Sequence, residues 1–427
     1  MRVLLAANPD KSMFLSLVPL AWALHTAGHE VRVAGQPHFA ATITQAGLTA
    51  VPVGRDRDLF QVLRHTGVSE EMMEETRVGL PTPYDCVVPG GEDIGWEEFR
   101  DGYALRVTHW HRLDNFPIIT GLVEFARAWK PDLVIWEALT YAGAIAAKAC
   151  GAAHARLLWS IDVFGATREL FLKRKAAQPV GEQADPPREW LDGYARRYGF
   201  EFSEDMVTGQ FTLDPLPASL RVAADLHYVP MRYIPYGGPA TVPDWLRVPP
   251  ERPRVALTLG TTATERFGGY AVRTQDVLDA LADLDVEVVA TIAESEQRKL
   301  TRVPDNTRVV SYVPLHALVP TCAAVINHAG PGTFLTTAVH GVPQLTVPWD
   351  FDEPELARRA ARQGASLMIR ADQATGPAIR AGLLRVLGEP SFRARAERLR
   401  DDIRALPSPN ELVPRLEQLT ADYRIGG

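Results

Sequence analysis

The sequence contains few cysteines and no long apolar run. Its three cysteines, Cys86, Cys150 and Cys322, lie far apart and form no CxxC pair, so we expect neither a disulfide framework nor a zinc site. No stretch approaches the roughly 18 apolar residues of a membrane helix. The apolar start gives way to Asn8 and Pro9, which is too early for a signal peptide. We therefore expect a cytoplasmic protein that does not contact the membrane.

The sequence also lacks an excess of positive charge and two common nucleotide motifs. The net charge of −7 at pH 7 argues against nucleic acid as a partner, because phosphate backbones are bound by basic faces. There is no GxxxxGK[ST] loop, which argues against ATP hydrolysis. No strand opens into GxGxxG with an acidic residue about 20 positions later, which argues against a nicotinamide enzyme.

What the sequence does contain is a repeated alternation of strands and helices. A buried strand is expected over 2–7, a helix over 15–28, a strand over 29–35, a helix over 39–47 and a strand over 49–54. Short glycine turns between such elements are typical of a parallel, doubly wound sheet. Residues from 55 to about 115 lose this rhythm, and we expect an irregular insertion there. It is either a functional loop or partner surface, or a variable surface excursion.

A proline-rich segment divides the chain. Residues 229–255 contain seven prolines and are predicted to be a linker. After it the same alternation starts again and continues to the C-terminus. We therefore predict an α/β protein with two Rossmann-like domains, 1–228 and 256–427, that face each other across a cleft. The last helix is expected to pack back on the N-terminal domain. Ligands usually bind in such clefts.

The most informative stretch is "AAVINHAGPGTFLTTAVHGVPQ", residues 323–344. A strand followed by a glycine turn and a helix places backbone N–H groups and the positive end of the helix dipole at one spot. Gly330 and Gly332 allow an anion to approach the backbone closely, and Thr333 adds a hydroxyl group. His328 contributes either a hydrogen bond or a positive charge to a diphosphate. Taken alone, the stretch fits a structural turn as well as a phosphate site.

Two further features favour a nucleotide-sugar ligand. Asp352 and Glu353 follow the next strand, about 20 residues past the glycine turn, and are expected at the mouth of the same cleft. Carboxylates there suit the hydroxyl groups of a sugar or a cationic sugar substituent. The first strand of this half ends in "LTLGT", and its Thr261 supplies another hydroxyl group.

These residues resemble a known family. "HAGPGT" followed by "GVPQLTVPWDFDEPELARR" is similar to the donor motif of nucleotide-sugar glycosyltransferases of the GT-B fold. "SLVPLAWALHTAGHEVRVAGQP", "KPDLVIWEALTYAGAIAA", "VPDWLRVPPERPRV" and "YVPLHALVPTCAAVINHAG" resemble the bacterial polyketide-antibiotic branch. Members of that branch attach TDP-deoxysugars, often amino sugars, to macrolide or anthracycline aglycones. The resemblance covers nearly the whole chain except about residues 60–115.

The resemblance implies roles for the donor residues. His328 matches the diphosphate-contacting second residue of a His-His or Thr-His pair, with Asn327 in the first place. Gly330, Gly332 and Thr333 would complete the phosphate site, and the segment around Val313 would meet the pyrimidine base through backbone groups. Asp352 and Glu353 match an Asp-Gln pair that holds sugar hydroxyls. Because Glu loses a hydrogen-bond donor and adds charge relative to Gln, the change favours an amino sugar.

The acceptor side departs from the family pattern. Members carry a His general base after the first strand, oriented by a later acid; here Met13 stands at the His position, and Glu137 is the acid. Three alternatives follow. Glu137 acts as the base if burial raises its pKa, Asp10 in the same loop acts instead, or the acceptor hydroxyl is acidic enough to need little help. We favour Glu137 over Asp10, and expect Met13 and Trp136 to line the acceptor side.

The implied reaction is an inverting transfer without a cofactor or metal, with a TDP-sugar as co-substrate. Glycosyltransferases of this branch often need an auxiliary activator protein that docks on the N-terminal domain, and we expect that contact within 55–115. Self-association, as a homodimer, is the competing explanation for such a surface. Two other functions remain open from the sequence: a nucleotide-sugar epimerase of the same architecture, and a non-catalytic sugar-nucleotide-binding partner protein.

Overall fold

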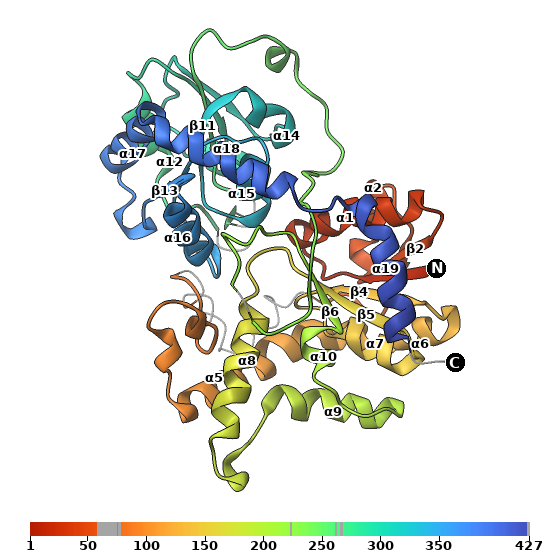
Figure 1. The fold of residues 1–427 in the computed structure, drawn as a ribbon. Helices are drawn as coiled ribbons and strands as arrows, with labels where there is room; N and C mark the ends of the chain where they lie inside the picture. The colour runs from red at the N-terminus through yellow and green to blue at the C-terminus, as the bar shows by residue number, and fades with distance from the viewer. Residues whose placement is uncertain (58–74, 76–77, 223, 261–262, 265–267, 425–427) are drawn as a thin grey trace.

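The protein consists of two α/β halves that follow one another along the chain (Figure 1). The computed structural model describes residues 1–57, 75, 78–222, 224–260, 263–264 and 268–424. Within them, every strand pairing is parallel.

The first half is built on a sheet of seven described strands in the order β3-β2-β1-β4-β5-β6-β7. The strands are β1 (Arg2–Ala6), β2 (Glu30–Gly35), β3 (Ala50–Pro52), β4 (Leu133–Glu137), β5 (Ala153–Leu157), β6 (Phe211–Asp214) and β7 (Tyr228–Pro230). The helices are α1 (Lys11–Thr26), α2 (Ala40–Gln45), α5 (Trp96–Arg106), α6 (Arg112–Trp129), α7 (Ala142–Cys150), α8 (Val163–Ala176), α9 (Pro186–Tyr198) and α10 (Asp205–Thr208).

The second half repeats the plan with six described strands in the order β10-β9-β8-β11-β12-β13. They are β8 (Arg254–Thr258), β9 (Glu287–Thr291), β10 (Thr307–Val310), β11 (Cys322–Asn327), β12 (Gln344–Thr346) and β13 (Ser366–Met368). The helices are α12 (Thr274–Leu281), α13 (Glu294–Gln297), α14 (Leu315–Leu318), α15 (Pro331–Ala338), α16 (Glu353–Gln363), α17 (Gly376–Gly388), α18 (Pro390–Arg404) and α19 (Pro409–Tyr423).

The central strands of both sheets are buried and mostly apolar, since helices cover both faces of each sheet. All five residues of β4 and all five of β8 are buried, as expected for parallel sheets. This alternation is the pattern that the sequence indicated, and the predicted α/β class with two doubly wound sheets is confirmed.

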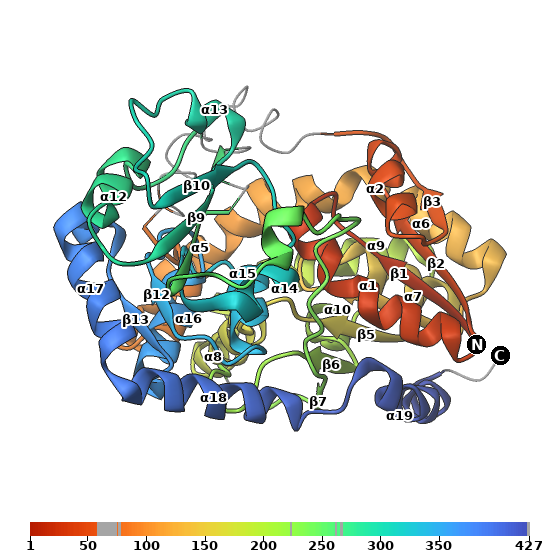
Figure 2. The ribbon, with the colours of Figure 1, turned by 90° about the horizontal axis from the view of Figure 1, so that it is seen from above.

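The C-terminal helices run from the second half back to the first. Figure 2 shows α18 and α19 along one side of the molecule. α18 packs on α15, where Leu399 and Ile403 join the same apolar cluster as Phe334 and Leu335. α19 lies against α1 instead, and four of its side chains enter the core of the first half: Leu412, Val413, Leu416 and Leu419.

The stretch 55–115 differs from the irregular insertion that the sequence suggested. From Trp96 the chain is helical: α5 continues through a π-helical turn, Val107–His111, into α6. Phe99, Tyr103 and Val107 are buried at helical spacing, but the many charged residues between them masked this pattern. Most of the segment 58–77 lies outside the described residues.

Candidate active site

Both sheets have a point where the strand order reverses, and the predicted site residues gather there. In the first sheet the reversal lies between β1 and β4, and in the second between β8 and β11. Loops that leave the carboxyl ends of two such strands turn to opposite faces, which leaves a crevice where ligands bind. Asp10 follows β1 and Glu137 ends β4, whereas Gly260 follows β8 and His328 follows β11.

Two glycines enclose the ring of His328, which is only 9% exposed. A Cβ atom on Gly260 would lie 2.6 Å from its Cε1 atom, and one on Gly330 would lie 2.2 Å from its Nε2 atom. From the sequence, we predicted that glycine at position 330 lets an anion approach the backbone closely. In the structure, the absence of a side chain at this position leaves space for the imidazole ring of His328. Gly260, at φ +75°, was not predicted at all.

His328 is neutral near physiological pH. Burial lowers the pKa of its imidazole to about 4, because a charged ring loses its hydration. Of the two alternatives that the sequence left open, a hydrogen bond therefore fits and a permanent positive charge does not. A hydrogen bond to the backbone of Thr258 opposes this lowering of the pKa but is the smaller effect.

The turn before α15 is held from inside the protein. Asn327 is buried, accepts a hydrogen bond from the backbone N–H of Ala329 (2.8 Å) and donates one to Gln344 (2.8 Å). Ala329 has a left-handed backbone, at φ +65°. Asn327 thus shapes the turn and does not face a ligand.

The N-terminus of α15 is open to a ligand. Gly330 is the N-cap residue, without a side-chain cap, and Pro331 follows it. Gly332 is exposed and Thr333 is half-buried, so the N–H groups of the first turn point away from the core without helical partners. Tyr233 of the interdomain connection steadies this turn, because its hydroxyl lies 3.1 Å from the carbonyl of Gly332.

Asp352 and Glu353 start α16 and lie next to the same turn. They are 3% and 8% exposed. The Oε2 atom of Glu353 accepts hydrogen bonds from the N–H groups of Trp349 (3.3 Å) and Asp350 (3.1 Å). Its Oε1 atom lies 3.5 Å from the Nε2 atom of His328. The predicted phosphate and sugar residues are thereby brought together.

Burial changes what these carboxyl groups can do. It raises the pKa of Asp352 to about 6, and it raises the pKa of Glu353 well above its usual range, with Asp350 adding to the effect. A protonated carboxyl group donates a hydrogen bond as an amide does. The family has Gln where this chain has Glu353, so we expected one hydrogen-bond donor to be lost. The proton on the buried carboxyl group partly restores that hydrogen-bond donor.

Two other predicted donor residues contribute less to this picture. Thr261 lies outside the described residues. Val313 is buried among Leu318, Val319 and Val325, and a backbone contact from it to a base stays a prediction. The adjacent Tyr312 is 56% exposed and was not singled out.

The side chain of Glu137, the predicted base, is covered by its neighbours. It is fully buried, and its Oε2 atom accepts hydrogen bonds from the N–H of Leu139 (2.9 Å) and the indole of Trp159 (3.3 Å). The hydroxyl of Thr140 donates to its Oε1 atom. Burial raises the pKa of Glu137 to about 7, which was the condition set for its action as a base.

Asp10 and Trp136 have structural positions. Asp10 caps α1, because its Oδ1 atom accepts hydrogen bonds from the N–H (2.7 Å) and hydroxyl (2.6 Å) of Ser12. Trp136 is fully buried, and its indole donates to His154 (3.3 Å) inside the core. This corrects the expectation that Trp136 lines the acceptor side. Met13 is half-buried and packs on the large apolar cluster that the two halves share.

Asp114 is a third carboxylate here, and the sequence analysis missed it. It lies in α6, accepts a hydrogen bond from the side chain of Asn8, in the loop after β1, and helps to raise the pKa of Glu137. No spacing rule connects residues 8, 114 and 137, because they meet only when α6 packs beside β1 and β4.

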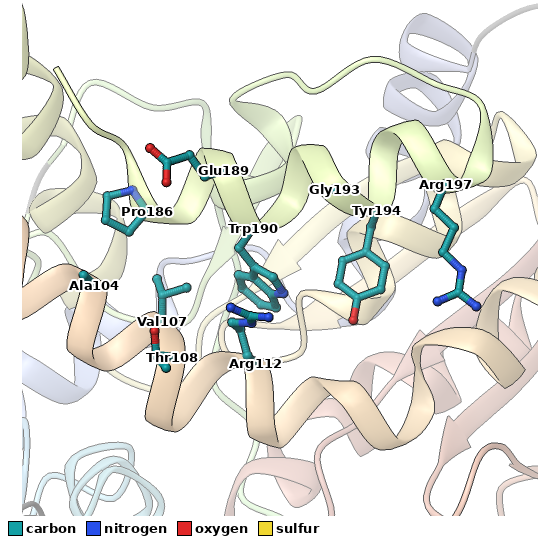
Figure 3. A pocket seen from close by; sticks show the side chains of 10 residues that line it. All are labelled: Ala104, Val107, Thr108, Arg112, Pro186, Glu189, Trp190, Gly193, Tyr194 and Arg197. Atoms are coloured by element: carbon teal, nitrogen blue, oxygen red, sulfur yellow. The ribbon is translucent and has the colours of Figure 1, made fainter. Parts of the chain in front are cut away.

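A groove lies away from both reversal points, between α9 and the helices α5 and α6 (Figure 3). It has a volume of about 510 Å³. Its lining residues are Ala104, Val107, Thr108, Arg112, Pro186, Glu189, Trp190, Gly193, Tyr194 and Arg197. The side chains of Trp190 and Arg112 face each other in it.

No metal centre is found among the described residues, where no three His, Cys, Asp or Glu side chains cluster suitably. His109 and His111 have the i, i+2 spacing of some metal ligands, but His111 is buried and bonded to the hydroxyl of Tyr84. Burial lowers the pKa of His111 to about 3. Nor is any helix in the described part long and apolar enough to cross a membrane.

Comparison with known proteins gives matches along the whole chain. Residues 22–260 match the N-terminal domain model of the erythromycin biosynthesis protein CIII-like family, and residues 275–419 match its C-terminal domain model. The 10-deoxymethynolide desosaminyltransferase of Streptomyces venezuelae is 45% identical over 99% of this chain and 98% of its own. The aklavinone 7-beta-L-rhodosaminyltransferase of Streptomyces galilaeus is 44% identical over 99% of this chain and 97% of its own.

Solved structures agree with these matches. Glycosyltransferase VinC in complex with dTDP has a TM-score of 0.87 and 38% identity, covering 99% of this chain and 100% of its own. The spinosyn forosaminyltransferase SpnP has a TM-score of 0.82 and 39% identity, covering 99% of each chain.

Proposed function

This chain belongs to the erythromycin biosynthesis protein CIII-like family of glycosyltransferases, and we propose that it transfers a deoxysugar from a TDP-sugar to a hydroxyl group of a polyketide aglycone. The observation that carries the proposal is the contact between His328, at the N-terminal turn of α15, and Glu353, 3.5 Å away. It joins a site for a diphosphate to a site for a sugar. Relatives named as desosaminyl-, rhodosaminyl- and mycaminosyltransferases support an amino sugar as the group transferred.

The donor half stabilises the leaving group. As the bond from the anomeric carbon to TDP breaks, negative charge develops on the diphosphate. The open N–H groups at the start of α15 and the N–H of neutral His328 donate hydrogen bonds to that charge. We propose that these groups take the place of a divalent metal ion. The test of that point is an unchanged transfer rate in EDTA.

The acceptor half supplies the base. We propose Glu137 as the base. With a pKa of about 7, its carboxyl group is partly ionised near neutral pH and still binds a proton strongly enough to take one from the acceptor hydroxyl. Trp159 is half-buried and covers its Oε2 atom, so Trp159 is the side chain that must move to admit the acceptor hydroxyl. A single displacement from the opposite face then inverts the anomeric carbon.

Partner proteins are a separate proposal. We infer that an auxiliary activator protein contacts the first half within 55–115, with a homodimer as the competing arrangement. The groove beside α9 supports a contact there, because Val107, Thr108 and Arg112 of that stretch line it. Co-purification with a candidate activator would support the activator contact. A doubled mass of the protein alone in gel filtration would support the homodimer. We also propose a cytoplasmic location.

A transfer assay tests the function. The protein is incubated with a TDP-activated deoxysugar, either an amino or a neutral one, and with a macrolide or anthracycline aglycone. The masses of the products are measured by mass spectrometry. We expect an aglycone heavier by one deoxysugar residue and an equal amount of TDP. Donor isomerised without an aglycone would identify an epimerase instead. Donor binding without turnover, even with a candidate activator present, would identify a binding protein.

A further inference from the structure

The backbone of Phe351 is unusual and lies next to the donor-sugar residues. Phe351 stands between β12 and α16, immediately before Asp352, and has φ of +41°. Bulky side chains rarely adopt this left-handed region, and such a conformation persists only where the surroundings hold it in place.

Three aromatic side chains of the other half surround the ring of Phe351. Its ring centre lies 5.4 Å from that of Trp110, at 87°, and 6.0 Å from that of Tyr84, at 74°. It is stacked on Phe164 at 6.0 Å and 26°. We name Tyr84, Trp110 and Phe164 the aromatic box. These edge and stacked arrangements are the favourable ones for aromatic pairs.

The box is itself fixed inside the first half. Tyr84 is fully buried and bonded to His111 through its hydroxyl. Trp110 stacks on His111 with ring centres 5.1 Å apart. Phe164 lies in the first turn of α8 and is also buried. The ring of Phe351 therefore packs against side chains that are also held by contacts within the first half.

A second contact ties α16 to the same half. The guanidinium of Arg359 donates a hydrogen bond to the carbonyl of Arg221 (2.6 Å) and another to Glu355 (2.7 Å). Figure 1 shows α16 at the junction between the halves, above α5 and α8. The diphosphate turn does not use these contacts, because Asn327, Gln344 and the two glycines around His328 hold it from the second half. A further hydrogen bond to it comes from Tyr233 of the interdomain connection.

We propose that Phe351 is a positioning residue, which locks Asp352 and Glu353 into the geometry that holds the donor sugar by inserting its ring into the aromatic box of the acceptor half. This proposal rests on the proposed function, which identifies the ligand as a TDP-sugar. It predicts that recognition of the sugar depends on the aromatic box of the first half, whereas recognition of the diphosphate does not depend on that box.

The test compares binding of TDP with binding of the TDP-deoxysugar that gives product in the transfer assay, by calorimetry. In Phe351→Leu the affinity for TDP should stay within about two-fold of wild type, whereas the affinity for the TDP-sugar and kcat should each fall about ten-fold. Trp110→Leu should act in the same way, and the double variant should lose little more than either single one. Unchanged TDP binding also shows that the variants are folded.

Phe125→Leu is the matched control. Phe125 is half-buried and stacks on Trp129, 5.7 Å away, in the same half but outside the box, so its variant should bind both ligands as wild type does. Equal losses for TDP and TDP-sugar in Phe351→Leu, no loss for either, or simple additivity with Trp110→Leu would overturn the positioning role. A wild-type protein that fails to transfer sugar would overturn the proposed function instead.

Discussion

The Nε2 atom of His328 lies 3.5 Å from the Oε1 atom of Glu353, although 25 positions separate them in the sequence. The contact joins the loop after β11 to the turn before α16. It sets the order of the proposed donor site: diphosphate at α15, then sugar at the carboxyl groups, then the acceptor half.

Gly330→Ala should destabilise the protein, whereas Gly332→Ala should not. An added Cβ at position 330 would lie 2.2 Å from the His328 ring, but one at position 332 would meet only the hydroxyl of Tyr233, at 4.0 Å. We expect a loss of about 1–3 kcal/mol in the free energy of unfolding for the first variant alone. Denaturant unfolding of both variants is the measurement, and equal stability would refute the enclosed histidine.

Glu137→Gln should lower kcat by about 10²–10⁴-fold if Glu137 is the base, with TDP binding unchanged. In wild type, kcat should rise with pH through about 7, because the base acts in its ionised form and burial raises its pKa to about 7.

Asp114→Asn separates the two neighbouring carboxylates. The charge of Asp114 raises the pKa of Glu137, so removing it should move the rise in kcat to lower pH and leave the maximum within about ten-fold of wild type. If Asp114→Asn abolishes transfer and Glu137→Gln does not, then Asp114 is the base. Rates across pH 5–9 decide between them.

Glu137 should also make the fold less stable as pH rises. Its pKa is raised from 4.5 to about 7 in the folded protein, so the folded state holds its proton more tightly than the unfolded state. The resulting stability is fully present below pH 4.5 and is lost as pH rises through about 7. The loss is on the order of 3 kcal/mol. Urea unfolding at pH 5 and pH 8 should show a smaller difference for Glu137→Gln than for wild type, and equal differences would contradict the burial of an ionisable Glu137.

Glu353→Gln should shift the donor preference toward neutral deoxysugars. An amide keeps the hydrogen bonds to the N–H groups of Trp349 and Asp350 but cannot pair with an ammonium group. An ammonium group bound beside Glu353 favours the ionised carboxylate and so opposes the effect of burial on its pKa. We therefore expect kcat/KM for an amino sugar donor to fall about ten-fold relative to a neutral one. An unchanged ratio would mean that Glu353 acts in its neutral form, as the raised pKa allows.

The sequence predicted the fold well because its signals were local. Buried runs such as β4 and β8 and glycine stops such as Gly28 mark strands and helices without reference to the rest of the chain. His328, Asp352 and Glu353 were also found, since they follow the ends of adjacent parallel strands. The helical character of 96–115 was missed because its buried residues are separated by charged ones.

The parts that were missed depend on long-range contacts. Asp114 meets Asn8 across 106 positions, and the ring of Phe351 meets Tyr84 in the other half. Trp136 was expected on the acceptor side, but it is fully buried and its indole donates to His154 in the core. No periodic pattern in the sequence predicts these contacts.

The most direct test of the central claim is calorimetric titration of wild type, His328→Ala and His340→Ala with TDP, UDP and AMP. His340 is a half-buried histidine just after α15, so its variant controls for loss of an imidazole in the same half. We predict that wild type and His340→Ala bind TDP in preference to UDP and AMP, and that His328→Ala loses about 10²-fold or more in TDP affinity. TDP binding that is unaffected by His328→Ala, or no TDP binding by wild type, would contradict the diphosphate site at α15.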